Sequence, residues 1–326
     1  MRKHKGEMQD FQSRFHQRWK HLNDPDVRAL AWLLDAPDML DPRSSQWRGR
    51  IAALPSTAGD EAAGWLAELD RDPARLHAYL AVQPFTRLGR YAEKLLAYYF
   101  EHLGILAASG VQVRAGKNET VGEFDFLLRA AGGLMHWEFA TKLYLLESSG
   151  AGHEADYFVG PNLADTLGLK MRKILDRQLA LAAHPAASAY LPEPVVAARA
   201  LVKGWLFYHD AEAAAGMPAG VAPEHCRGFW CALGEFEASA QEIYVILPRL
   251  RWLAPFQAAA DNMLDGAGLR ATLAAHFERD SMPVLVALVR RDGDFIYEYD
   301  RGFIVPDDWH ARAGDRVRRV RIQEAG

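Results

Sequence analysis

The sequence contains few cysteines, no excess of basic residues and no long apolar run. Two cysteines in 326 residues cannot form a disulfide framework or a four-thiolate zinc site. A formal charge of −4 and a pI of about 6.3 give no global basic excess that would indicate nucleic acid. No run approaches the roughly 18 apolar residues of a membrane-spanning helix, and the N-terminus has no apolar signal core. We therefore expect a cytoplasmic protein without a membrane partner.

The chain has instead an ordinary globular composition, with 50% apolar, 25% charged and 11% aromatic residues. Its length allows one large or two modest domains. The charge is uneven, because residues 1–20 hold six Lys or Arg against two acids and residues 309–326 hold five against two. The rest of the chain carries a net charge of −11. Basic ends on an acidic body indicate either a polyanion partner or solvated tails.

Hydrophobic periodicity divides the chain into three parts. We predict an N-terminal helical extension over 1–84, a core over 85–210 and a C-terminal α+β extension over 224–326 that packs on the core. The predicted fold class is α/β, with a mixed central sheet of four strands between two helices. The predicted helices cover parts of 8–80 and the ranges 85–103, 163–183 (N-cap Asn162), 237–246 and 256–278. The predicted strands cover 105–114, 122–130, 134–146, 195–208, 283–291 and 294–304, and an Ala/Gly/Pro-rich linker covers 211–223.

Charged residues gather on one face of the hairpin predicted over 122–146. Period-two alternation directs Glu123 and Asp125 on the first strand, and Glu138 and Lys142 on the second, toward the same side. Clustered carboxylates repel one another by about 1–4 kcal/mol per close pair, depending on the effective dielectric. Such a face is tolerable either in water, as the solvent side of a ribbon, or around a divalent cation.

The helices on either side of this hairpin carry polar residues inside their apolar arcs. Glu93 is flanked by Gly89 and Ala97 one turn away on each side, and Gln178 lies among apolar neighbours. Hydrogen bonds to the backbone would explain each residue singly, because buried polar side chains need partners. Together with the acidic hairpin they form a more specific pattern.

This ordered pattern resembles the PD-(D/E)XK nuclease superfamily. The likeness is carried by GRYAE at Gly89–Glu93, GEFDF at Gly122–Phe126 and HWEFATK at His136–Lys142. With FVGPN at Phe158–Asn162 after them, these segments are most similar to a bacterial domain-of-unknown-function family placed in that superfamily. The resemblance covers about residues 85–208.

The resemblance implies a restriction-endonuclease-like core and Mg²⁺- or Mn²⁺-dependent hydrolysis of phosphodiester bonds in DNA. Asp125 and Glu138 would hold the metal ion, with Glu93 completing the set of ligands. The superfamily also has a catalytic lysine two residues after the second acid, where this sequence has Ala140.

Two lysines are candidates for the missing position. Lys142 lies on the same strand face as Glu138, about 13 Å further along the strand. Lys170 replaces it if the following helix crosses above the site, and Gln178 then serves as a neutral donor. A basic helix side of Lys170, Arg172, Lys173 and Arg177 is either solvated or grips a phosphate backbone.

Two other functions stay open from the sequence. One is a non-catalytic nucleic-acid-binding or scaffold protein that retains the nuclease fold, and the other is an enzyme acting on a small phosphorylated substrate. The group of His225, Cys226 and Cys231 lacks a fourth ligand at zinc spacing, which favours buried thiols over a metal site.

Overall fold

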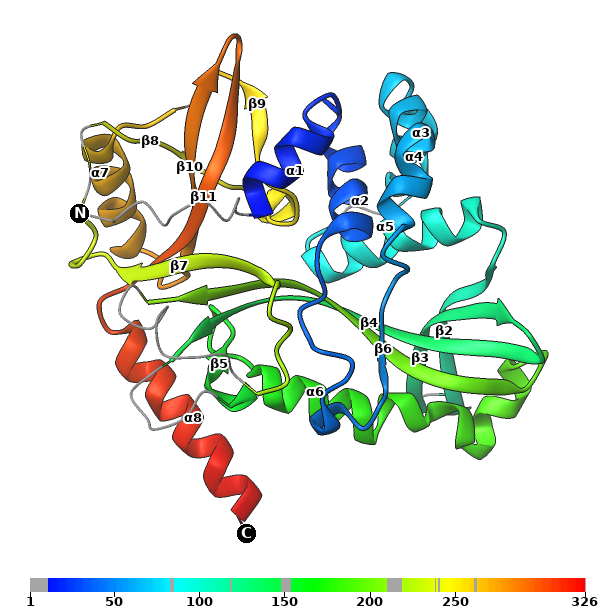
Figure 1. Cartoon of the computed structure of the whole chain (residues 1–326). Coiled ribbons are helices and arrows are strands. Elements are labelled where there is room, and N and C mark those ends of the chain that lie inside the picture. The colour runs from blue at the N-terminus through cyan, green and yellow to red at the C-terminus, as the bar shows by residue number, and fades with distance from the viewer. Residues whose placement is uncertain are drawn as a thin grey trace.

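The computed structural model describes residues 11–82, 85–117, 119–147, 154–209, 219–237, 239, 241–260 and 263–325. Residues 148–153, the basic residues before Phe11 and most of the predicted linker over 211–223 lie outside these ranges. The described strands form one mixed sheet, in which β2, β3, β4, β6, β7, β11, β10 and β8 follow one another from edge to edge. The sheet crosses the middle of the molecule in Figure 1.

The two longest strands form the centre of this sheet. β4 (Gly133–Leu146) and β6 (Val195–Tyr208) pair in parallel, and β7 (Cys226–Ala232) and β11 (Phe295–Val305) continue the parallel part. Antiparallel strands complete each side: β2 (Leu106–Gly116) and β3 (Glu119–Ala130) on one, β10 (Val284–Asp292) and β8 (Ile243–Ile246) on the other. Short strands join from the side: β1 (Ile51–Ala52), β5 (Phe158–Val159) and β9 (Gln257–Ala259).

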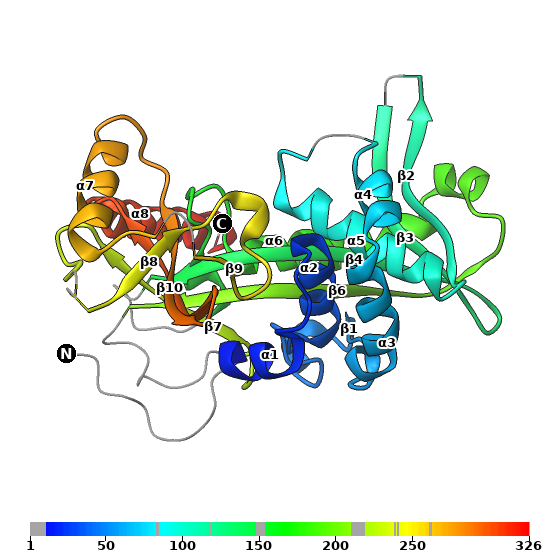
Figure 2. The ribbon, with the colours of Figure 1, turned by 90° about the horizontal axis from the view of Figure 1, so that it is seen from above.

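Helices cover both faces of the sheet. In Figure 1 the helices α1 (Phe11–Trp19), α2 (Pro25–Asp35), α3 (Ala58–Arg71), α4 (Ala74–Leu80) and α5 (Leu88–His102) lie above the sheet, and α6 (Leu167–Asp176) lies below it. The view from above in Figure 2 places α2 and α5 across the central strands, with the β2–β3 hairpin projecting at one end. The remaining helices are α7 (Gly266–Phe277) and α8 (Trp309–Ala325), with the 3₁₀ turns Ser45–Trp47, Ala155–Tyr157, Gln178–Ala183, Pro185–Tyr190 and Arg249–Arg251.

Aromatic packing fixes α5 against the hairpin. The Phe100 ring meets Phe126 of β3 and Trp137 of β4 edge to face, at centroid distances of 5.2 and 5.8 Å. Such contacts add about 0.5–1.5 kcal/mol each beyond the area that they bury. Glu93 lies two helical turns before Phe100, so the same stripe of α5 that packs on the sheet carries this carboxylate toward β3.

The mixed α/β architecture with flanking helices confirms the coarse prediction from the sequence, but the expected sheet of four strands is too small. β7 pairs with β6, and β11 pairs with β7, so one sheet passes from the predicted core into the predicted C-terminal extension. The division into three domains stays a prediction. The apolar C-terminal strands continue the sheet because parallel edge strands bury their free backbone groups by pairing.

Of the two helices predicted after residue 236, the first is wrong and the second is confirmed only in its C-terminal half. Residues Ile243–Ile246 form β8, which pairs with β10. The range 256–278 contains β9 and the shorter helix α7. A short apolar run is compatible with either state, and here the neighbouring strand decides. The C-terminal hairpin is confirmed, with Gly293 at its turn at a φ of +62°.

The helix predicted over 163–183 is shorter than expected. It begins after Thr166, whose hydroxyl accepts a hydrogen bond from the Leu169 N–H at 3.2 Å, so Thr166 and not Asn162 is the N-cap. Residues 160–165 form a turn closed by the Gly160 N–H and the Asp165 carbonyl. The α-helix ends at Asp176, and Gln178 opens a separate 3₁₀ turn that brings its side chain back toward the sheet.

Candidate functional site

Asp125 lies at the point where β3 separates from β4. The β3–β4 ladder runs from Ala130 and Gly133 to Phe126 and Trp137. At Asp125, one residue beyond this ladder, the side chain replaces the backbone as the hydrogen-bond acceptor. Its Oδ2 accepts the Phe139 N–H at 2.9 Å. The carboxylate is therefore oriented by the main chain of the neighbouring strand.

Two further carboxylates meet Asp125 at this opening. Glu93 of α5 and Glu123 of β3 each offer an oxygen, and these oxygens and one of Asp125 all lie within 4.8 Å of one another. Arg90, one turn before Glu93, donates to both glutamates, with Nη1 at 3.1 Å from Glu93 Oε1 and 2.6 Å from Glu123 Oε1. We call Glu93, Glu123 and Asp125 the acidic cluster.

Glu138 is buried beside this cluster and is held by neutral donors. His136 Nε2 lies 2.8 Å from Glu138 Oε1, and the Gln178 amide donates to Oε2. Burial lowers the pKa of His136 to about 4, so the ring is neutral near pH 7. Its Nδ1 has no hydrogen-bond partner among the described residues.

The two candidate lysines have different surroundings. Lys142 Nζ binds Asp165 Oδ2 at 2.7 Å, and Tyr144 donates to the same oxygen at 3.3 Å. Lys170 Nζ binds Gln178 Oε1 at 3.3 Å, and its charge acts on both Asp125 and Glu138. Burial, and then the charge of Lys142, lower the pKa of Lys170. Lys170 is therefore the one of the two lysines whose charge lowers the pKa of Asp125 and of Glu138.

Burial and mutual repulsion make these acids hard to ionise. Burial, and then the charge of Glu138, raise the pKa of Asp125 to about 7. Burial, and then the charge of Asp125, raise the pKa of Glu93 to about 7, and burial does the same for Glu138. Only Glu123 moves the other way, because the hydrogen bond from Arg90 lowers its pKa. The site holds more negative charge than its own cations neutralise.

All six residues predicted for the site lie in this region, but not in one contact group. Glu93 and Asp125 belong to the acidic cluster, Glu138 interacts with Asp125 from the adjoining strand, and Lys142 points to Asp165. The reading of the charged face as the solvent side of a ribbon is wrong for Glu138, which is 1% exposed. The catalytic and metal-binding roles themselves stay predictions.

Three neighbours were not among the predicted site residues. Glu123 was placed on the correct strand face but not in the metal-binding set, and it completes the acidic cluster. His136 lies two residues before Glu138, so strand alternation predicts that the two side chains share a face. Arg90 lies three residues before Glu93 on the same helix, a spacing at which side chains meet.

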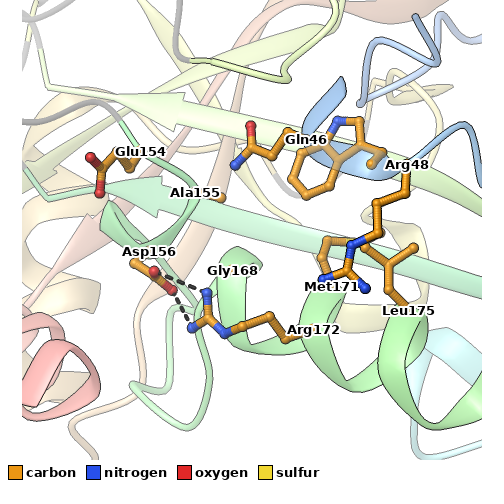
Figure 3. Close-up of a pocket in the computed structure, with 10 residues that line it drawn as sticks. Gln46, Arg48, Glu154, Ala155, Asp156, Gly168, Met171, Arg172 and Leu175 are labelled. Atoms are coloured by element: carbon orange, nitrogen blue, oxygen red, sulfur yellow. Dashed lines mark hydrogen bonds and ion pairs between the residues drawn. The ribbon is translucent and has the colours of Figure 1, made fainter. Parts of the chain in front are cut away.

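The basic side of α6 is smaller than expected. Arg172 binds Asp156 at a cavity, as Figure 3 shows. The two nitrogen–oxygen distances are 2.8 and 3.1 Å, and the cavity has a volume of about 190 Å³. Lys170 turns toward the acids instead, as described above. Lys173 and Arg177 are the exposed cations of this helix side. The cavity in Figure 3 contains none of the predicted site residues.

A second group of possible metal ligands, made up of Asp24, Asp26 and His77, has a structural role. Asp24 caps α2 by accepting the Asp26 and Val27 N–H groups, and His77 Nε2 lies 2.8 Å from its other oxygen. Asp26 accepts the Tyr91 hydroxyl at 2.7 Å. These donors tie α2 to α4 and α5. The cysteines are also buried, as the sequence indicated, and neither forms a disulfide among the described residues.

A comparison with family models places the chain. Residues 28–305 match the model described as "Domain of unknown function (DUF1853)", which spans the sheet and the acidic cluster. The chain belongs to this family. No curated protein and no solved structure matches it. Among the described residues of this family member, no helix is long and apolar enough to cross a membrane.

Proposed function

We propose that this protein is a divalent-metal-dependent nuclease of the PD-(D/E)XK type that hydrolyses phosphodiester bonds in DNA. The observation that carries the proposal is the acidic cluster: three carboxylate oxygens within 4.8 Å, placed where β3 leaves β4. The order α5, β2, β3, β4, α6 and β6, with β4 parallel to β6, supports a restriction-endonuclease-like core.

The chemistry of this cluster fits Mg²⁺ or Mn²⁺. Hard divalent cations take carboxylate oxygens at 2.0–2.6 Å, and three oxygens within 4.8 Å can surround one such ion. Burial raises the pKa values of Glu93 and Asp125, and neighbouring carboxylates raise them further, so a bound cation would favour the ionised forms. Glu138 adds a fourth carboxylate if it exchanges one of its two donors. Bound at this place, the ion would supply activation of water and neutralisation of charge on a phosphate oxygen.

The protein groups around the cluster have separable tasks. Asp125 is oriented by the Phe139 N–H, and one of its oxygens lies within 4.8 Å of oxygens of Glu93 and Glu123. Lys170 has one proton on Gln178 Oε1, so its other N–H groups are available to orient a water molecule or a phosphate oxygen. Gln178 joins Lys170 to Glu138, which makes the distance between cation and carboxylate a property of the fold.

The test is cleavage of plasmid and single-stranded DNA by the full chain in Mg²⁺ or Mn²⁺, with EDTA as the blank. Asp125→Asn and Lys170→Met should each lower the rate by at least about 100-fold, the usual scale for an essential acid–base or metal-binding group. Lys173→Met is the matched control, because it removes an exposed charge from the same helix. Lys142→Met tests the competing lysine and should retain most of the activity. Thermal midpoints without metal exclude loss of folding.

A non-catalytic nucleic-acid-binding protein with the same fold is the second candidate. It is favoured by one observation, the ion pair that ties Lys142 to Asp165 while Ala140 occupies the usual lysine position. DNA binding in Ca²⁺ without cleavage in Mg²⁺ or Mn²⁺ would establish this alternative. Cleavage of small phosphodiesters without DNA affinity would instead indicate a small substrate. Absence of both metal binding and cleavage would end the nuclease proposal.

A further inference from the structure

Arg90 binds the carboxylates that the proposed metal ion would need. Its Nη1 contacts both oxygens of Glu93 at 3.1 and 3.2 Å, and its two Nη atoms reach the two oxygens of Glu123 at 2.6 and 3.2 Å. Glu93 and Glu123 are two of the three members of the acidic cluster. The guanidinium thus binds the same carboxylates that a divalent ion would need.

A guanidinium and a divalent ion cannot share these oxygens without cost. Two like charges in contact with the same carboxylates repel each other, and a divalent ion doubles the repulsion that a monovalent one would cause. The ion also needs lone pairs that the Arg90 N–H groups now occupy. Entry of the ion therefore weakens the contacts of Arg90 with Glu93 and Glu123.

Arg90 is free to leave, unlike the other cation of the site. Its side chain is 52% exposed, and it stands in the first turn of α5. Lys170, by contrast, is partly buried on the opposite side and hydrogen-bonded to Gln178. A released Arg90 would stand at the solvent side of the centre, where the substrate arrives.

We propose that Arg90 is a displaceable counter-ion: it neutralises the acidic cluster in the metal-free protein, is released by the divalent ion and then binds a phosphate of the nucleic acid. A guanidinium suits this second role because its planar fork donates two parallel hydrogen bonds to phosphate oxygens. This inference rests on the proposed function. It adds a coupling, since metal binding would create the phosphate-binding group.

The experiment measures two affinities that should move in opposite directions. Calorimetry with Mn²⁺ alone gives the metal affinity, and fluorescence anisotropy of a labelled DNA duplex in Ca²⁺ gives the nucleic-acid affinity. Arg90→Met should bind Mn²⁺ about 3- to 10-fold more tightly, because the competing guanidinium is gone. The same variant should bind DNA about 10-fold more weakly, because a bidentate phosphate contact is lost.

Arg87→Met is the matched control, since it removes an exposed arginine three residues earlier on the same helix end. It should leave the Mn²⁺ affinity unchanged and reduce DNA affinity by less than Arg90→Met does. Arg90→Lys keeps the charge without the fork and should be intermediate in both measurements, which guards against a folding defect of the methionine variant.

Weaker Mn²⁺ binding by Arg90→Met would overturn the inference and show that Arg90 holds the carboxylates in place. Unchanged DNA binding would also overturn it. In either case Mn²⁺ binding by the wild type would leave the proposed function standing. A wild-type protein that binds neither Mn²⁺ nor Ca²⁺ would remove the proposed function and this inference together.

Discussion

Two of the regions in which the described residues bury charged groups are built differently. In the C-terminal part, Arg301 and Glu298 of β11 are 0% and 1% exposed and form two hydrogen bonds, at 2.6 and 2.8 Å. Arg301 also donates to the carbonyls of Trp252 and Ala254, and Glu298 accepts the Phe256 N–H. Each charge meets an opposite charge and backbone partners.

The acidic cluster has no such balance. Glu93, Glu123 and Asp125, with Glu138 beside them, face Arg90 and Lys170, so carboxylates outnumber cations by two to one. Three of the four carboxyl groups accordingly have raised pKa values. The comparison teaches that matched buried charge joins elements together, whereas unmatched charge marks a candidate site for a ligand.

The largest expected effect is on the matched pair. Arg301→Met should lower the free energy of unfolding by about 3–5 kcal/mol, because it leaves the Glu298 carboxylate buried with its main partner removed. Denaturant-induced unfolding measures this loss. Adding Glu298→Gln should recover part of it, since the orphaned charge is then gone. A loss below about 1 kcal/mol would show that the pair does not hold β11 to the loop before β9.

The next effect separates the two regions by their response to metal. Mn²⁺ at 100 times its dissociation constant should stabilise the wild type by about 2.7 kcal/mol through mass action. Asp125→Asn should abolish this gain, whereas Asp24→Asn, which keeps the cap of α2, should retain it. Thermal midpoints with and without Mn²⁺ give the comparison. Loss of the gain in Asp24→Asn alone would move the metal site to the second acidic group.

A smaller effect is expected from pH in the metal-free protein. The pKa of Glu93 is about 7 in the folded state, against 4.5 ordinarily, so the folded state binds more protons than the unfolded state between these values. Stability contributed by the protonated group is present below about pH 4.5 and is lost as pH rises to about 7. Between pH 4.5 and pH 7 the free energy of unfolding of Glu93→Gln should therefore rise relative to that of the wild type, by on the order of 1–2 kcal/mol.

Unfolding at pH 5 and pH 8 measures the difference between the two proteins. Glu61→Gln on α3 is the control, because this exposed carboxylate lies outside the cluster. A constant difference between wild type and Glu93→Gln across the window would mean that Glu93 is not forced toward its protonated form.

The smallest effect concerns Lys142. Its ion pair with Asp165 is about one third exposed on each side, and such pairs contribute about 0–1 kcal/mol. Lys142→Met should change stability by less than 1 kcal/mol and leave Mn²⁺ affinity unchanged. A strong loss of metal affinity would return Lys142 to the site and remove the distinction drawn between it and Lys170.

Local signals predicted the elements around the site well. The apolar spacing over 85–103 predicted α5, and strand alternation with Gly132 and Gly133 at the turn predicted the β3–β4 hairpin. Alternation also placed Asp125 and Glu138 on one side, because antiparallel neighbours share a face. These patterns repeat within a few residues, so each segment by itself contains the information that predicts its secondary structure.

Contacts between distant segments were not predictable in the same way. β8 was expected as a helix because its four apolar residues show no period, and only pairing with β10 makes them a strand. The choice of Lys170 over Lys142 depends on the path of α6 below the sheet and on the break after Asp176 that returns Gln178 to Glu138.

The sequence by itself determined that a helix with Glu93 precedes a hairpin with Asp125 and Glu138, and that an apolar core surrounds them. Only the tertiary structure decided that Glu123 completes the acidic cluster, that Arg90 binds two of its members and that Glu138 is buried. The reason is physical. Periodicity specifies which way a side chain points from its own backbone, whereas its neighbours, its exposure and its pKa depend on the elements packed against it.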